Sequence, residues 1–131
     1  MKLLLDTHAL LWFIGNNPEL SKASRQSIED PANDKFVSAV SLWEIAIKIS
    51  LEKLKLPRPF GEVFPHQLEV NGFELLPISC GQLTQLASLP FHHRDPFDRM
   101  LAVQALEHNL LLVSADAVFG DYLSTNLQLM C

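Results

Sequence analysis

The pattern of apolar and polar positions divides the chain into short strands that alternate with amphipathic helices. Runs rich in apolar residues predict strands buried inside a sheet, at residues 2–5, 35–40, 73–78, 110–116 and 127–130. Helical spacing of apolar residues predicts the helices, at residues 7–15, 20–30, 41–54, 64–70, 80–88 and 96–108. This alternation is typical of βαβ units, so we expect an α/β fold with helices on both faces of a central, mostly parallel sheet.

The composition indicates a single globular domain over residues 1–131. The chain is 48% hydrophobic and 19% charged, which is enough apolar material for a core. No apolar run is long enough to cross a membrane, and Asp6 and His8 interrupt the apolar start, which predicts a buried strand rather than a signal peptide. The distant cysteines, Cys80 and Cys131, form neither a metal pair nor a disulfide framework, so we expect a cytoplasmic protein. The net charge of −5 argues mildly against binding of nucleic acid.

The segment HHRDPFDRMLAVQALEHN, residues 92–109, places two carboxylates where a helix begins. Asp95 fits the N-cap position and Pro96 the first helical position. Asp98 is then the third helical residue, where a negative charge meets the positive end of the helix dipole. Taken alone, this segment favours helix capping over catalysis.

Four acidic residues are predicted to lie along one edge of the sheet. Asp6 directly follows the first strand, and Asp116 follows the fourth. Glu44 is expected in the first turn of the helix after the second strand, and Asp98 in the first turn of the helix that leads into the fourth strand. All four positions belong to the carboxyl-end edge of a parallel sheet, where open α/β proteins bind ligands. Each acid also has a local explanation, as a helix cap, a solvated residue or a turn residue.

Convergence of these carboxylates is electrostatically unfavourable unless something offsets their charge. At ~5 Å and an effective dielectric constant of ~20, one pair costs about 3 kcal/mol. Bound cations or raised pKa values relieve this repulsion. Mg²⁺ takes oxygen ligands and keeps several waters, and Mn²⁺ fits the same reasoning. One or two such ions can activate water for phosphodiester cleavage.

Four blocks of the sequence, LLLDTHALLW, SAVSLWEIAIK, HHRDPFDRMLAVQA and LLLVSAD, resemble the PIN-domain family, and more closely its VapC-type toxins. The blocks cover nearly the whole chain in the order of the family. The resemblance implies an α/β/α sandwich, an Mg²⁺- or Mn²⁺-dependent endoribonuclease and usually a homodimer. The acidic site of the family corresponds to four residues here: Asp6, Glu44, Asp98 and Asp116. Supporting residues are expected beside them: Thr7, Ser114 and the N-cap Asp95.

The resemblance also implies an RNA substrate and an inhibitory partner. We expect Lys48, Arg94 and Arg99 to contact RNA, although Lys48 can instead pair with Glu44 one helical turn away. A further basic stretch is expected to be a solvated face: Lys53, Lys55 and Arg58. A VapB-like antitoxin is expected to cover the acidic groove, with a basic side chain entering the acid cluster and an apolar groove providing affinity.

Other residue types are assigned less specific roles. His92 and His93 are expected in a loop near the site, because no cysteine or regular histidine spacing supports a Zn²⁺ site. Trp12, Phe13 and Trp43 are expected in the core or in a dimer interface rather than as platforms for stacked bases.

Two alternative functions remain open at this point. A catalytically silent PIN-like module would bind RNA or protein without cleavage. A phospho-accepting receiver domain has a similar length and also gathers acids at strand ends. It requires an Asp after a middle strand and a Lys after the last strand. The segment FELLPIS ends without an Asp, and no Lys follows Asp116, so the sequence disfavours this class.

Overall fold

A computed structural model describes residues 1–91, 95–116, 118–120 and 128–130. The central sheet is all parallel, with the order β3-β2-β1-β4-β5. Its strands are β1 (Lys2–Leu5), β2 (Asp34–Ser38), β3 (Phe73–Leu76), β4 (Leu111–Val113) and β5 (Gln128–Met130). The predicted α/β class with a parallel sheet is therefore confirmed.

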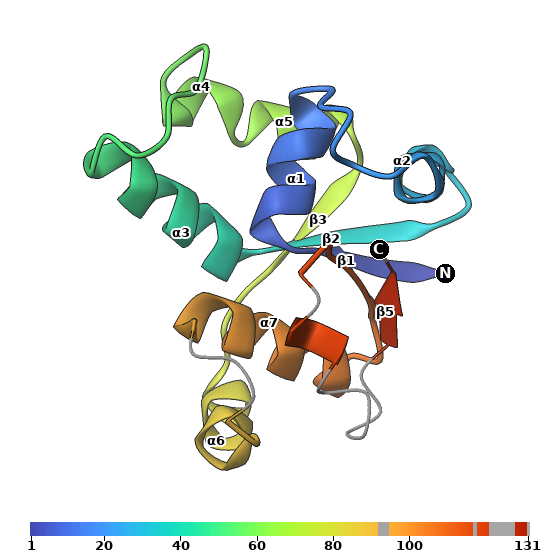
Figure 1. Ribbon diagram of the computed structural model, residues 1–131, viewed down its shortest axis with the longest axis vertical. Helices are drawn as coiled ribbons and strands as arrows, with labels where there is room; N and C mark the ends of the chain where they lie inside the picture. Colours follow the sequence, from blue (N-terminus) through green and yellow to red (C-terminus); the bar gives the residue numbers. More distant parts are fainter. Residues whose placement is uncertain (92–94, 117, 121–127, 131) are drawn as a thin grey trace.

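Helices cover both faces of this sheet, as Figure 1 shows. One layer contains α1 (Thr7–Ile14), α2 (Lys22–Glu29), α3 (Ala39–Ser50), α4 (Phe60–Val63) and α5 (His66–Val70). The opposite layer contains α6 (Cys80–Ser88) and α7 (Pro96–Glu107). Within the described ranges, the search for a helix long and apolar enough to span a membrane found none.

The central strand β1 separates two hydrophobic clusters. Leu4 belongs to the cluster that contains Leu101 of α7, whereas Leu3 and Leu5 belong to the cluster that contains Leu10 of α1. Successive side chains of a strand point to opposite faces, so a strand covered on both faces needs apolar residues at every position. This requirement explains the uninterrupted apolar run at the start of the chain.

The third helix begins earlier than predicted. Ser38 is its N-cap, because the Ser38 hydroxyl accepts a 3.0 Å hydrogen bond from the backbone N–H of Val40. The helix therefore starts at Ala39, within the segment predicted as strand 35–40, and ends at Ser50 rather than at residue 54. Consequently Glu44 lies in the second helical turn, which corrects its predicted place in the first.

The helix predicted over residues 64–70 is present as α5, which spans His66–Val70 and begins two residues later than predicted. Phe64 is instead extended, between α5 and the short helix α4, which ends at Val63. The reason is Pro65, since a residue that precedes proline is disfavoured in the helical region.

Candidate active site

The order of the sheet reverses between β1 and β4. Strands β2 and β3 lie on one side of β1, and β4 and β5 lie on the other. In open α/β sheets, such a switch point forms a ligand-binding crevice at the carboxyl ends of the strands. The backbone N–H of Asp6 donates a 3.1 Å hydrogen bond to the carbonyl of Val113, so Asp6 lies beside the carboxyl end of β4.

Asp6 is buried at this switch point, with 3% of its surface exposed. It is the N-cap of α1, and Oδ1 accepts a 2.8 Å hydrogen bond from the backbone N–H of Ala9. Burial raises the pKa of Asp6, while hydrogen bonds from Ser114 and Ala9 and the nearby His8 act in the opposite direction. The negative charge of Asp116 contributes a smaller increase to this pKa. The two carboxylates therefore lie close enough to interact.

Ser114 connects these two acids. Its hydroxyl is hydrogen-bonded to the side chain of Asp6 and accepts a 3.0 Å hydrogen bond from the backbone N–H of Asp116. Asp116 also has the local role that the sequence left open, because its Oδ1 accepts a 3.0 Å hydrogen bond from the N–H of Val118. The turn after β4 thus holds the side chain of Asp116 in place and, through Ser114, orients the side chain of Asp6.

Glu44 is buried near the start of α1, with 6% of its surface exposed. Its Oε1 accepts a 2.6 Å hydrogen bond from the hydroxyl of Thr7, and its Oε2 lies 3.0 Å from Nζ of Lys48. A buried carboxylate requires such partners, because an unpaired buried charge is costly. Thr7 directly follows Asp6 in the chain. The hydrogen bond from Thr7 therefore ties Glu44 to the residue next to Asp6. The ion pair that the sequence offered as an alternative role for Lys48 is present.

Asp98 occupies the predicted third position of α7. Asp95 is the N-cap, and its Oδ1 accepts hydrogen bonds from the backbone N–H groups of Phe97 (2.8 Å) and Asp98 (3.2 Å). The capping role of Asp95 is therefore confirmed. Helix α7 packs against α3 through an edge-to-face contact between Trp43 and Phe97, whose ring centroids are 5.1 Å apart. Each of these rings directly precedes one of the acids, so the packing holds the acid-bearing parts of both helices together.

In the ranges 1–91, 95–116, 118–120 and 128–130, no group of three or more Asp, Glu, His or Cys side chains is arranged to hold a metal ion. The carboxylates point instead toward hydrogen-bond and ion-pair partners nearby. Glu44 is directed toward Thr7 and Lys48, and Asp116 toward the N–H of Val118. Asp6, Glu44 and Asp116 thus take hydrogen-bond or ion-pair partners from the protein.

Arg99 has a structural role that the sequence did not predict. It is buried, and its guanidinium donates hydrogen bonds of 3.3–3.4 Å to the carbonyls of Leu86, Leu89 and Pro90. The guanidinium also lies over the ring of Phe91, 4.3 Å from its centroid. These contacts satisfy carbonyl groups at the end of α6 and hold the guanidinium on that helix. The other predicted RNA contact near this helix, Arg94, lies outside the described residues together with His92 and His93.

The aromatic residues divide between core and surface. Trp12 and Phe13 are half-buried, and one side of each ring packs against the hydrophobic cluster beneath α1. Trp43 does not, because 58% of its surface is exposed.

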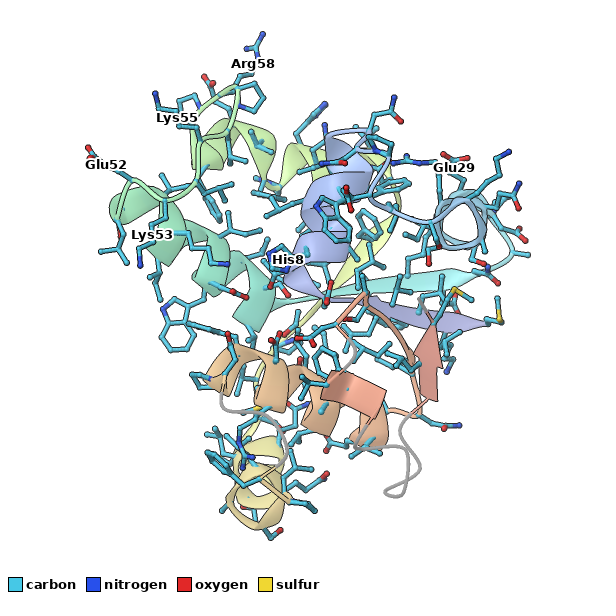
Figure 2. The ribbon with its side chains drawn as sticks, in the orientation of Figure 1. His8, Glu29, Glu52, Lys53, Lys55 and Arg58 are labelled. Atoms are coloured by element: carbon cyan, nitrogen blue, oxygen red, sulfur yellow. The ribbon has the colours of Figure 1, made fainter. Side chains whose placement is uncertain are left out.

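Sequence reasoning missed one feature beside the acids. A groove of about 1050 Å³ opens between α1, α3 and the loop that follows α3. Figure 2 shows His8 at the start of α1 and Lys53, Lys55 and Arg58 on that loop. The clustering of cations over residues 53–58 was visible in the sequence, but the facing helix was not.

The fold and the buried acids at its switch point define a doubly wound α/β protein with an acidic candidate site. The sequence pattern of the PIN domain family matches residues 3–122. Ribonuclease VapC22 from Mycobacterium tuberculosis is 31% identical over 115 residues, which cover 86% of this chain and 85% of that protein. The chain belongs to the PIN domain family.

Solved structures share the fold at lower sequence identity. VapBC2 from Rickettsia felis, bound to a DNA fragment from its promoter, matches with a TM-score of 0.73 and 18% identity, over 99% of this chain and 98% of that chain. VapBC-1 from nontypeable Haemophilus influenzae matches with a TM-score of 0.66 and 18% identity, over 99% and 97% of the two chains. These likenesses confirm the predicted PIN-like arrangement of sheet and helices.

Proposed function

We propose that this protein is a divalent-metal-dependent endoribonuclease that acts as the toxin of a toxin–antitoxin pair. The observation that carries the proposal is the buried carboxylate of Asp6 at the switch point of the sheet, beside Asp116 and hydrogen-bonded to Ser114. Membership of the PIN domain family and 31% identity to a protein named as a ribonuclease support RNA as the substrate.

The chemistry of the acids fits Mg²⁺ or Mn²⁺ as the cofactor. Both ions prefer oxygen ligands, and a nearby cation favours the ionised form of a carboxylate. Such a charge would oppose the burial that raises the pKa of Asp6. The proposed ligands are the four carboxylates Asp6, Glu44, Asp98 and Asp116. When bound, a divalent ion supplies an activated water and offsets negative charge on the reacting phosphate.

The hydroxyl and capping residues are proposed to position these carboxylates. The Ser114 hydroxyl orients Asp6, and the Asp95 cap fixes the start of the helix that carries Asp98. Asp6 and Asp98 thus lie at the capped starts of α1 and α7. Residues held in this way need less reorganisation when a ligand binds.

To serve as a ligand of a divalent cation, Glu44 would have to release Lys48. Its Oε1 keeps the hydrogen bond from Thr7, whereas its Oε2 is the oxygen that Lys48 occupies at 3.0 Å. Once released, the ammonium group of Lys48 would lie beside the reacting phosphate. The RNA contact predicted for Lys48 is therefore kept as part of this proposal. Arg94 is retained as the second proposed RNA contact.

We further propose a VapB-like antitoxin as the inhibitory partner and a homodimer as the assembly. The matched solved structures are of VapBC2 and VapBC-1, which supports a partner of that kind. An acidic site is blocked most directly by a basic side chain of the partner. For the dimer, Trp43 offers an exposed aromatic surface beside Phe97, and aromatic residues are enriched in protein interfaces.

The decisive experiment is cleavage of RNA by the purified protein in Mg²⁺ or Mn²⁺, with EDTA as the metal-free control. Asp98→Asn keeps a polar residue at the third position of α7 but removes its charge, and we expect a loss of at least about a hundredfold in kcat. Asp30→Asn is the matched control, because Asp30 is an exposed residue after α2 that accepts a hydrogen bond from Ala32. Equal cleavage by wild type and Asp98→Asn would exclude Asp98 from the site. Binding of RNA without cleavage would identify a catalytically silent module.

A further inference from the structure

The groove beside the candidate active site, here called the basic groove, concentrates positive charge on an acidic protein. The chain has 10 Lys and Arg residues against 15 Asp and Glu. Four of those cations line the groove, but Glu62 alone among the described acidic residues does so. Its basic lining comprises Lys48, Lys53, Lys55, Arg58, His8 and His66. A concave surface lined by one sign of charge focuses its field and attracts ligands of the opposite sign.

Three of these cations have no carboxylate partner in the part of the chain that the structure describes. Lys53, Lys55 and Arg58 are exposed on the loop after α3, and no ion pair joins any of them to a described Asp or Glu. The sequence predicted a solvated face for this stretch, and the three side chains are exposed, as predicted. The structure adds that they line a groove with α1 on its other side (Figure 2).

The basic groove adjoins the candidate active site through two of its lining residues. Lys48 lines the groove, and its Nζ lies 3.0 Å from Oε2 of Glu44. His8 also lines the groove and lies two residues after Asp6. A linear anion bound along the groove would therefore reach the ammonium group that pairs with Glu44.

The groove also contains aromatic and apolar surface. His8 and Trp12 are one turn apart on α1, with ring centroids 5.7 Å apart and planes inclined by 33°. Leu54 and Leu56 contribute apolar side chains from the facing loop. Proteins that bind single-stranded nucleic acid combine a cationic track for the backbone with aromatic side chains on which bases stack.

We propose that the basic groove binds single-stranded RNA and leads it to the candidate active site. Lys53, Lys55 and Arg58 contact backbone phosphates, and the pair of His8 and Trp12 provides a stacking surface for a base. This inference rests on the proposed function, because only an RNA-cleaving site needs a binding groove that guides RNA to the carboxylates. Charge alone also fits an acidic protein segment, but the aromatic pair and the continuity with the acids favour RNA.

The test measures RNA binding separately from cleavage. Fluorescence anisotropy follows a labelled single strand of about a dozen nucleotides, within the usual range of site sizes, in EDTA. The double variant Lys53→Glu/Lys55→Glu is compared with Lys2→Glu/Lys22→Glu, which changes the net charge equally. Lys2 and Lys22 are exposed, and neither lines the groove. We expect at least a tenfold loss of affinity for the groove variant only. Loss of two phosphate contacts should make the salt slope of binding shallower by about 1.4.

A second measurement examines the aromatic pair. In Trp43→Phe, Trp12 is the one remaining tryptophan of the chain. Saturation with the same RNA should quench its fluorescence, whereas a polyglutamate peptide should neither quench it nor displace the RNA. Equal loss of affinity in both charge variants, no loss in either, or displacement by polyglutamate would overturn the assignment of the groove.

Cleavage assays in Mg²⁺ distinguish failure of this inference from failure of the proposed function. If Asp98→Asn abolishes cleavage while the groove variant binds RNA as well as wild type does, the groove assignment is wrong and the nuclease proposal stands. If wild type binds RNA through the groove but does not cleave it, the groove assignment stands and the nuclease proposal is wrong.

Discussion

Thr7 donates a 2.6 Å hydrogen bond to Oε1 of Glu44, across a sequence separation of 37 residues. Both side chains are buried, so removal of the hydroxyl leaves a carboxylate oxygen without its donor. Thr7→Val keeps the shape of the side chain and should lower the free energy of unfolding by about 1–3 kcal/mol, as urea titration would measure. Thr84→Val is the control, because the Thr84 hydroxyl bonds a carbonyl at an exposed site. Equal stability of the two variants would contradict a buried role for this hydrogen bond.

The raised pKa of Asp6 predicts a pH dependence of stability opposite to that of a salt-bridged acid. In the window between the unfolded value of 3.8 and the higher folded pKa, the folded state binds more protons than the unfolded state. The free energy of unfolding therefore falls as pH rises through this window. Asp6→Asn retains an N-cap residue and removes the titration, so its advantage over wild type should grow from acid to neutral pH in EDTA. Urea titrations at several pH values would measure it, and a constant difference would contradict the prediction.

Metal binding should be measurable without RNA. Mn²⁺ at about 100 times its dissociation constant should stabilise wild type by about 2.7 kcal/mol, which thermal unfolding detects. Glu44→Gln should reduce this stabilisation, because it replaces a charged ligand with a neutral one. Lys48→Gln should bind Mn²⁺ more tightly than wild type, since it removes the ammonium that lies 3.0 Å from Glu44. Weaker binding by Lys48→Gln would contradict the proposed release of Lys48.

Arg99 should matter for stability and not for RNA. Its planar guanidinium serves three carbonyls at the end of α6, which an ammonium cannot reproduce. Arg99→Lys should lower the free energy of unfolding by about 1.5–3 kcal/mol. Arg58→Lys, at an exposed position, should leave it unchanged within about 0.5 kcal/mol. Thermal unfolding and RNA anisotropy on both variants would separate a role in stability from a role in RNA binding. Loss of RNA binding by Arg99→Lys at unchanged stability would contradict the structural role of Arg99.

Most of the fold was accessible from the sequence because its signals are local. The apolar run of β1 and the Asp95 cap of α7 each act within a few residues and were predicted correctly. Errors arose where two local signals competed. Ser38 and Ser41 both precede apolar helical residues, and only the structure shows that Ser38 caps α3.

The candidate site was only partly accessible, because its contacts are not local. Topology alone placed the acids at one edge of the sheet. The sequence did not show that Thr7 would bond Glu44, or that Arg99 would turn away from the acids toward α6. Both depend on which helix packs against which, and the same is true of the groove formed by α1 and the loop after α3.

The central position of β1 has a consequence for synthesis of the protein. Asp6 emerges from the ribosome first, but its hydrogen-bond partner Ser114 lies on the segment that follows β4, near the other end of the chain. Contacts of such high sequence separation form late, after the intervening chain is made. A nascent or truncated chain that ends before β4 holds three of the four acids without the turn that orients the first. Whatever activity this edge of the sheet carries should therefore arise only after β4 and the turn that follows it have been synthesised.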